Sequence, residues 1–274
     1  MAARRPLVRQ GGRVKQLANT DTIAGLREQL TANRTYYVRT DGNDSNTGLA
    51  NDAAGAFLTL QKAVDVIAAL DTGTFTPTIV LGSGEFESAI GKDPTGASAV
   101  PIVGQGPANT TLKRTAASGN AFQGGTKFTL SNLTVTAPSG TARCIASLPG
   151  QIIGVSNVAF GPCGAYHMDA SGGIINCSSY SITGGGLVHA YAASGGRIIA
   201  AGITVTITGT PNFSLGFAFA DVMGLLRLNA NTYTGSATGK RYTSNNGSVI
   251  YVAGAGSTYL PGSTDGTVSG GIYA

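Results

Sequence analysis

Charged residues are scarce in this chain: only 11% of its 274 residues are Asp, Glu, Lys or Arg. Disordered chains combine high charge with low apolar content, and 42% of these residues are hydrophobic, so we expect a folded core. No run of 18 apolar residues occurs, so we expect no membrane-spanning helix. The basic start "MAARRPLVRQGGRVKQ" lacks an apolar segment, so we expect no secretory signal peptide.

Cysteine and histidine are also rare. Cys144, Cys163 and Cys177 cannot all pair with one another, and none stands in a CxxC spacing. We interpret them as buried small apolar side chains of a protein made in a reducing cytoplasm. The two histidines, His167 and His189, have no third ligand with metal-site spacing, so we expect neither a metal nor another cofactor.

Glycine, by contrast, is abundant, with 41 residues, and it marks an internal repeat. Five segments align on a glycine at intervals of 23–28 residues, and each carries three short strand-like runs. Such strands bury their apolar faces only when successive units stack. The pattern predicts an all-β fold, a right-handed parallel β-helix solenoid. The aligned glycines are expected at corners with positive φ: Gly125, Gly150, Gly173, Gly196 and Gly224.

The predicted solenoid shaft covers residues 36–239, because weaker units precede the five clear ones. Its first turn needs a cover, since an open strand edge invites aggregation. The stretch "LTLQKAVDVIAAL" at 58–70 predicts a short N-terminal capping helix, with Thr59 as its N-cap. The apolar residues at helical spacing are Leu60, Ala63, Val64, Ile67 and Ala68.

The net charge of +5 is local to the N-terminal segment. Residues 1–40 hold eight basic and two acidic residues, a net charge of +6, which leaves −1 for the rest. A basic arm can bind nucleic acid, but this one lacks interleaved aromatics. We therefore predict that residues 1–35 form a segment that docks to an acidic or apolar protein surface.

Residues 36–70, "YYVRTDGNDSNTGLANDAAGAFLTLQKAVDVIAAL", resemble the opening of pectate-lyase-like right-handed β-helix domains. That fold serves lyases, hydrolases and non-catalytic fibres alike. Residues 4–25 resemble the N-terminal segment of bacteriophage tail-fibre and tail-spike proteins, and residues 245–274 resemble a C-terminal segment common in phage tail proteins. The resemblance implies a structural tail protein, a short fibre or spike, that contributes to attachment to the host surface.

Several expectations follow from that resemblance. The protein is expected in the virion tail, assembled in the bacterial host cytoplasm as a homotrimer. Its partners would be other tail proteins and a host-surface glycan or envelope protein. Docking to the virion is assigned to Arg4, Arg5, Pro6, Leu7, Val8, Arg13, Val14 and Leu17. Residues 240–274 are predicted to cap the shaft and form the trimer, through Tyr242, Ile250, Tyr251, Tyr259, Leu260, Ile272 and Tyr273. The alternative is a monomeric cap folded back on its own shaft.

The segment "TDGNDSNTG" at 40–48 is rich in oxygen-bearing side chains. An EF-hand-like calcium site needs a Glu at the twelfth position, and counting from Asp41 that position is Asp52. Asp and Asn side chains also bond the nearby backbone in turns. We interpret the segment as a turn, with an ion bound to Asp41 and Asp44 as the alternative.

No catalytic constellation stands out, and we expect no enzyme activity; the alternative is a depolymerase of capsule or lipopolysaccharide. Glycoside hydrolysis needs two carboxylates close together. Asp169 and Asp221 are expected two turns apart on opposite faces, and Glu85 and Glu87 on an exposed strand. The only clear candidate for a glycan-binding loop is 209–220.

One aromatic stripe completes the pattern. Tyr166, Tyr191, Phe217 and Phe219 fall in corresponding strands, and we interpret them as packing residues rather than a sugar platform. The basic residues that a lyase would need beside a carboxylate stand at different register positions: Arg143, Arg197 and Arg227.

Overall fold

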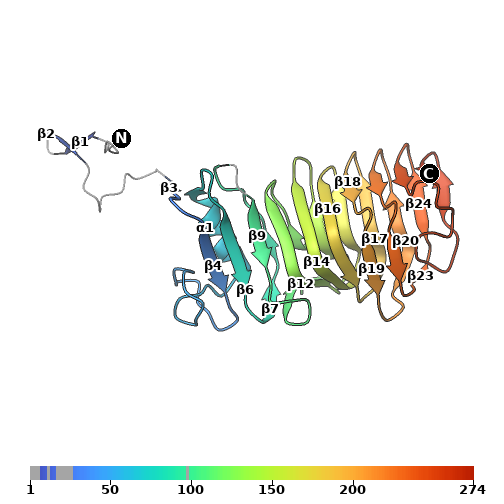
Figure 1. Ribbon diagram of the computed structural model, residues 1–274, viewed down its shortest axis with the longest axis horizontal. Coiled ribbons are helices and arrows are strands. Elements are labelled where there is room, and N and C mark those ends of the chain that lie inside the picture. The colour runs from blue at the N-terminus through green and yellow to red at the C-terminus, as the bar shows by residue number, and fades with distance from the viewer. Residues whose placement is uncertain (1–6, 11–12, 17–26, 97–98) are drawn as a thin grey trace.

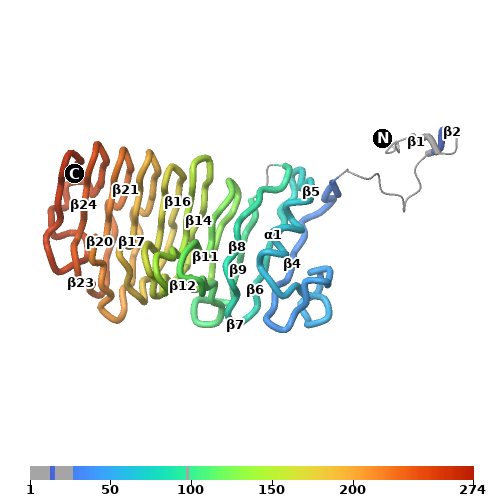
Figure 2. The backbone as a smooth tube through the Cα atoms, turned by 180° about the vertical axis from the view of Figure 1, so that it is seen from behind, coloured from blue at the N-terminus to red at the C-terminus, as the bar shows by residue number. Residues whose placement is uncertain are grey.

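The protein is a parallel β-helix of about 8 turns, seen from two sides in Figures 1 and 2. The computed structural model describes residues 7–10, 13–16, 27–96 and 99–274. Almost every strand pairs in parallel with strands of the turns before and after it. The predicted solenoid of three short strands per turn is confirmed.

The strands form three faces. The first face consists of β4 (Arg34–Val38), β6 (Pro77–Leu81), β9 (Val100–Val103), β18 (Arg197–Ile199), β21 (Leu225–Arg227), β25 (Val249–Tyr251) and β27 (Ile272–Tyr273). The second face consists of β7 (Gly84–Glu87), β10 (Thr110–Lys113), β19 (Thr204–Ile207) and β22 (Thr232–Thr234). Three long strands bend from the first face to the second: β12 (Phe128–Ala137), β14 (Ile152–Cys163) and β16 (Ile174–Ile182).

The third face is a separate sheet. It consists of β8 (Ala89–Ile90), β11 (Asn120–Gln123), β13 (Arg143–Ser147), β15 (Tyr166–Ser171), β17 (Gly186–Ala193), β20 (Asn212–Ala220), β24 (Tyr242–Asn245) and β26 (Thr267–Ser269), with β23 (Thr238–Gly239) beside β20. The remaining strands are β1 (Leu7–Gln10), paired antiparallel with β2 (Arg13–Gln16), and β3 (Glu28–Gln29), paired in parallel with β5 (Leu70–Asp71).

The bend between the first two faces depends on asparagine. Asn132 in β12 and Asn157 in β14 have φ of 55° and 50°, a left-handed conformation that asparagine adopts more readily than other residues with a side chain. Their side chains also pair between turns, since Asn157 Nδ2 donates to Asn132 Oδ1 over 2.9 Å. Apolar side chains from all three faces fill the interior, including Phe122, Phe160 and Phe213.

The aligned glycines are needed for a different reason than expected. Of the five, Gly150 has positive φ, as predicted, but Gly125, Gly173, Gly196 and Gly224 do not, so the prediction of left-handed corners at these four is wrong. A Cβ at Gly196 or Gly224 would collide with a backbone carbonyl of an earlier turn. These glycines allow successive turns to approach closely.

A single helix, α1 (Leu60–Ala68), occurs among the described residues, and it packs at the N-terminal end of the shaft (Figure 2). The Thr59 side chain accepts from the Lys62 N–H, which confirms the predicted N-cap. Four of the five predicted apolar positions are buried; Ala68 is half-buried. The Gln61 amide pairs with both backbone groups of Ile90, at 2.8 and 3.2 Å, and so satisfies the edge of β8 as a neighbouring strand would. The predicted capping helix is confirmed.

The shaft extends beyond both expected boundaries. β3 pairs with β5, and Leu30 is buried in the core, so the packed structure already includes residues of the segment assigned to 1–35. At the other end, β24 to β27 continue both parallel sheets past residue 239. Residues 240–274 therefore form the last turns of the solenoid instead of a separate segment.

Burial corrects part of the predicted trimer interface. Tyr242, Ile250 and Leu260 are buried within their own chain, because each occupies an inward position of the last turns. Tyr259 is half-buried, and its hydroxyl donates to Leu228 O over 3.1 Å. The rings of Tyr242 and Tyr273 stack 3.8 Å apart. Tyr251 and Ile272 are exposed and remain available to a neighbouring chain.

Only part of the predicted docking segment lies within the described residues. Arg4, Arg5, Pro6 and Leu17 lie outside the described residues, and Leu7 and Val8 are described only as backbone of β1. Arg13 and Val14, in β2, are exposed. No helix in the described part of the chain is long and apolar enough to cross a membrane.

Candidate functional site

The third face presents the most varied chemistry on its outer side. Its middle strands each place two consecutive residues inward, for example His167 and Met168 in β15, both fully buried. The outward positions are therefore three residues apart, as Tyr166 and Asp169 are. In register, Asp169 pairs with Ala146 of the turn before it and with Tyr191 of the turn after it. Ala146 in turn pairs with Gln123. Outward side chains of successive turns thus lie next to one another, about 4.8 Å apart.

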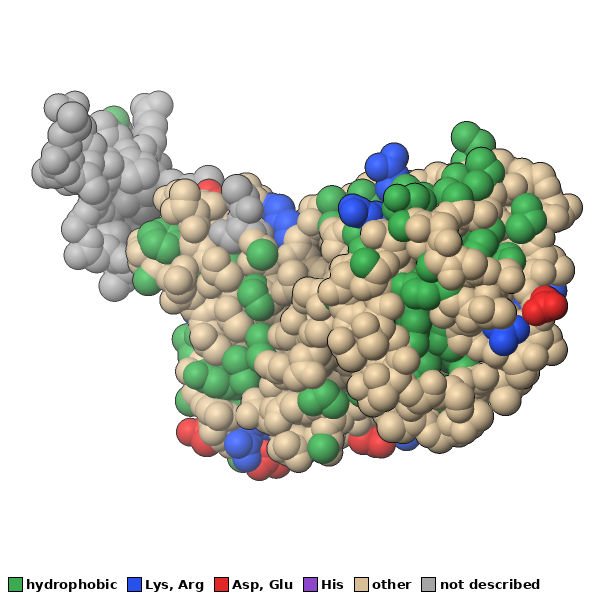
Figure 3. All heavy atoms as spheres, turned by 45° about the vertical axis from the view of Figure 1, so that its right-hand side comes forward, with side chains coloured by type: hydrophobic (Ala, Val, Ile, Leu, Met, Phe, Trp, Pro, Cys, Tyr) green, Lys and Arg blue, Asp and Glu red, His purple; other side chains and the backbone are tan. Residues whose placement is uncertain are grey.

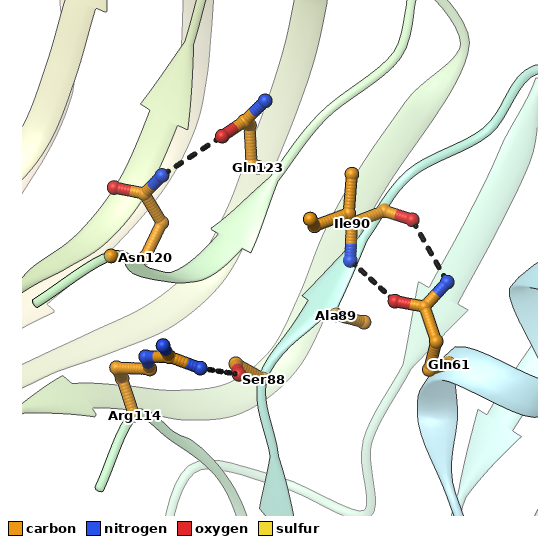
Figure 4. Close-up of a pocket in the computed structure, with 8 residues that line it drawn as sticks. Gln61, Ser88, Ala89, Ile90, Arg114, Asn120 and Gln123 are labelled. Atoms are coloured by element: carbon orange, nitrogen blue, oxygen red, sulfur yellow. Dashed lines mark hydrogen bonds between the residues drawn. The ribbon is translucent and has the colours of Figure 1, made fainter. Parts of the chain in front are cut away.

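A pocket of about 320 Å³ opens where α1 meets β8 and β11 (Figure 4). We call it the polar pocket; it is lined by Gln61, Ser88, Ala89, Ile90, Arg114, Gly119, Asn120 and Gln123. Five separate elements or connections contribute these residues, and no local sequence motif contains them. Only the stacking of turns brings them together.

The polar side chains of this pocket hold one another in place. Arg114 donates through Nη1 to Ser88 Oγ and through Nε to the Ser118 carbonyl, both over 2.8 Å. Asn120 Nδ2 donates to Gln123 Oε1 over 3.0 Å, as the dashed line in Figure 4 shows. The arrangement leaves the Gln123 amide nitrogen for a ligand, whereas Asn120 Oδ1 is buried and makes no hydrogen bond to the described residues. A free amide N–H donor can bond a ligand hydroxyl or another oxygen acceptor.

An aromatic ladder continues the same face along the shaft. Arg143, the register partner of Asn120, places its guanidinium 5.4 Å from the ring centre of Tyr166. Tyr166 stacks on Tyr191 at 4.5 Å, and Tyr191 meets Phe219 edge-to-face at 5.5 Å. We call these four residues, one per turn, the aromatic ladder. Tyr166 and Tyr191 cover one another's ring faces, Phe219 packs against Tyr191 through an edge contact, and all three rings are half-buried. The expected packing role is supported for these three rings.

The fourth residue of the predicted stripe points the other way. Phe217 is fully buried and packs on His189 at 4.8 Å.

Burial raises the pKa of Tyr166, and it raises the pKa of Tyr191 to about 12. Both phenols therefore keep their protons at neutral pH and can donate hydrogen bonds at the edge of the ladder.

Asp169 lies beneath the ladder and is fully buried. One carboxylate oxygen accepts from Ser171 Oγ over 2.6 Å, and the other lies 3.1 Å from Arg143 Nη1. Burial raises the pKa of Asp169, while the Ser171 hydrogen bond and the Arg143 charge oppose that rise. The ion pair fixes Arg143, which in turn supports the Tyr166 ring.

The expectation that Asp169 and Asp221 occupy opposite faces is wrong. Register aligns Asp169 with Tyr191 and Tyr191 with Phe219, and Asp221 follows Phe219 by two residues. Both carboxylates act on Tyr191 and raise its pKa. Counting back from the aligned glycines failed because the connection from Ser171 to Ile174 is one residue shorter than the corresponding connection from Ala193 to Arg197 in the next turn. Asp221 accepts from the Val222 N–H and from Asn246 Nδ2, so it also fixes a turn.

The other expected sites prove structural. In "TDGNDSNTG", Asp44 accepts from the Leu58 and Thr59 N–H groups, both over 2.9 Å, and Asp41 pairs with Arg39. These contacts support the interpretation as a turn. No group of three or more potential metal ligands occurs among the described residues.

The predicted loop at 209–220 is not a loop. Residues from Asn212 onward belong to β20 and pair with β17 and β23, so the insertion lengthens a strand.

Glu85 and Glu87 are exposed, as expected, and Glu85 pairs with Lys113 on the neighbouring turn at 3.0 Å. The three cysteines are free and buried, which confirms the prediction that they are buried side chains.

Comparison with known proteins identifies the fold alone. No protein-family model and no curated protein sequence matches the chain. Among solved structures, it resembles pectin methylesterase PemA from Erwinia chrysanthemi, with a TM-score of 0.50 and 10% sequence identity. The match covers 86% of this chain and 94% of the esterase chain. The chain is a parallel β-helix.

Proposed function

We propose that this β-helix is a structural bacteriophage tail protein, a short fibre or spike, whose third face binds a glycan of the host surface. The observation that carries the glycan-binding role is the continuity of the polar pocket with the aromatic ladder. From β8 to β20 they occupy five steps between neighbouring strands, about 24 Å. Amide and hydroxyl groups can bond sugar hydroxyls, and tyrosine rims combine apolar contact with a donor.

The resemblance of residues 4–25 and 245–274 to phage tail segments supports the virion location. On the side of the molecule seen in Figure 3, charged side chains are few and scattered. Attachment of the particle would use the N-terminal segment, and the shaft would present its third face to the host.

The test uses purified protein and the envelope polysaccharides of the host. Wild-type protein should bind a capsule or lipopolysaccharide fraction, and Gln123→Ala should weaken that binding because it removes an amide from the pocket. Asn176→Ala is the matched control, since it removes an exposed amide from a hollow on the first face. Equal binding by wild type and Gln123→Ala would place the glycan elsewhere, and no binding by wild type would remove the proposal.

A polysaccharide-cleaving enzyme is the second candidate function. It is favoured by Asp169, since a carboxyl group with a raised pKa suits proton donation. Against it, the carboxyl lies beneath Tyr166 and Tyr191, and among the described residues no second carboxylate contacts it. Release of reducing ends by wild type, abolished in Asp169→Asn, would establish the enzyme; release that persists in that variant would exclude Asp169 as the acid.

The homotrimer stays a prediction, now restricted to exposed residues. Tyr251 is 41% and Ile272 54% exposed in the single chain, and both lie in the last two turns of the first face. Light scattering should give three times the monomer mass, and Ile272→Asp should reduce it. A monomeric mass for the wild type at micromolar concentration would end the trimer prediction.

A further inference from the structure

We propose that the polar pocket binds an anionic substituent of the glycan, a carboxylate or a phosphate group, through Arg114. This inference rests on the glycan-binding role proposed above and specifies its ligand. Among the described residues that line the pocket, Arg114 alone carries a charge. The other polar lining residues supply a hydroxyl and three amides, so no negative charge from the lining opposes an incoming anion.

The guanidinium of Arg114 is held in place with part of its donor set free. Nε and Nη1 are fixed by the Ser118 carbonyl and by Ser88 Oγ, while Nη2 makes no hydrogen bond to the described residues. The nearest carboxylate, Glu87, is 3.9 Å away, beyond hydrogen-bond distance. Glu87 is instead held by Thr115, whose hydroxyl donates to it over 2.7 Å. A guanidinium fixed in this way can bind an anion without first losing side-chain freedom.

Charges on both sides of the pocket are already compensated. Towards α1, Lys92 and Asp65 pair at 2.6 Å, and towards the ladder Arg143 and Asp169 pair at 3.1 Å. Neither pair leaves an excess of charge beside the pocket. The nearest remaining charge is Glu87, which Thr115 holds 3.9 Å from Arg114. The anion preference therefore depends on the free Nη2 of Arg114, and the Gln123 amide nitrogen lies where it can bond a neighbouring hydroxyl.

The experiment compares three tetrasaccharides by isothermal titration calorimetry on the full chain. One is built of glucuronic acid, the second is the same compound with its carboxyls reduced to alcohols, and the third is that neutral compound carrying a 6-phosphate. Wild type should bind either anionic compound at least about tenfold more tightly than the neutral one, as charge-assisted hydrogen bonds predict. Whichever anionic compound binds more tightly distinguishes carboxylate from phosphate. The preference should fall as salt is raised.

Variants separate the charge of Arg114 from its structural contacts. Arg114→Gln should lose the anionic preference, and Arg114→Lys should keep part of it because the charge remains. Lys113→Gln is the matched control: it removes a neighbouring charge that pairs with Glu85 on the second face, and it should change no affinity by more than about twofold. Thermal melting of each variant establishes that it is folded.

Three results would overturn the inference. Equal affinity of wild type for neutral and anionic compounds would refute the anion preference and leave the glycan-binding role standing. An equal loss for all compounds in Arg114→Gln would assign Arg114 a structural role. If host polysaccharide and all three compounds fail to bind, both the inference and the proposed function fall.

Discussion

The buried histidine pair should make this protein sensitive to mild acid. His167 in β15 and His189 in β17 are fully buried, with their Nδ1 atoms 3.0 Å apart. One imidazole must donate its proton and the other must accept it, so the hydrogen bond requires at least one neutral ring. Phe160 stacks on His167, and Phe213 and Phe217 pack around the pair. These phenylalanine rings offer no negative charge to balance an additional proton on either imidazole.

The direction and size of the effect follow from the pKa values. Burial lowers the pKa of His167 from 6.5 to about 4. The pKa of His189 is lowered well below its ordinary value by burial and by the charge of His167. The unfolded chain takes up protons below about pH 6.5, whereas the folded chain takes up few until about pH 4. Stability is therefore lost as pH falls through this window, by about 3 kcal/mol for His167 alone, out of the roughly 5–15 kcal/mol typical of a domain.

Urea unfolding at a series of pH values between 7 and 4 provides the measurement. The chain has only these two histidines, so His167→Leu/His189→Leu removes every histidine contribution. The double variant should show a flatter pH dependence than wild type. The raised pKa of Asp169 acts in the opposite direction, because acidification favours its folded, protonated form, and it is present in both proteins. Parallel curves for wild type and double variant would refute the reasoning.

Three further predictions concern the shaft. Gly196→Ala should lower the free energy of unfolding by about 1–3 kcal/mol, because overpacking pushes successive turns apart; an unchanged urea midpoint would contradict this. Gln61→Ala should cost about 1–3 kcal/mol by unpairing the edge of β8 and should increase aggregation, which light scattering can follow. Arg143→Met should destabilise the protein at pH 7 and progressively less as the pH falls, because burial raises the pKa of Asp169 and favours its neutral form in acid; a loss independent of pH would show that the charge is irrelevant.

The predicted docking segment calls for a modified truncation. Because Leu30 is buried, the deletion should stop at residue 26 instead of residue 35. The shortened chain should remain folded and melt cooperatively but fail to enter virions. Loss of the β-sheet circular dichroism signal would show that the removed residues are needed for folding, and normal incorporation into particles would refute their docking role.

The fold was accessible from the sequence because each turn repeats the same apolar pattern. The glycine-aligned segments gave the period, and the spacing of Leu60, Ala63, Val64 and Ile67 gave the helix that covers the first turn. Both signals are local and recur at a fixed spacing. The last turns were misassigned because their apolar residues, such as Tyr242, look like an exposed strip when the repeat spacing is not recognised.

The candidate site could not be predicted from the sequence in the same way. Gln61, Arg114 and Gln123 are separated by many residues, and only the register of the early, weakly repeating turns brings them together. The prediction for the faces of Asp169 and Asp221 is wrong because their positions were counted from the glycine, and the connection that holds this glycine differs by one residue between turns. A signal was nevertheless present: the inward pairs His167–Met168 and Phe217–Ala218 precede Asp169 and Phe219, which aligns these two outward positions.

The central claim, that the third face is the glycan-binding surface, is tested most directly by a structure of the protein determined with a saturating host oligosaccharide. The account predicts sugar density over β8 to β20, with one unit in the polar pocket against Gln123 and others along the rims of Tyr166 and Tyr191. Density confined to the first or second face would contradict the account.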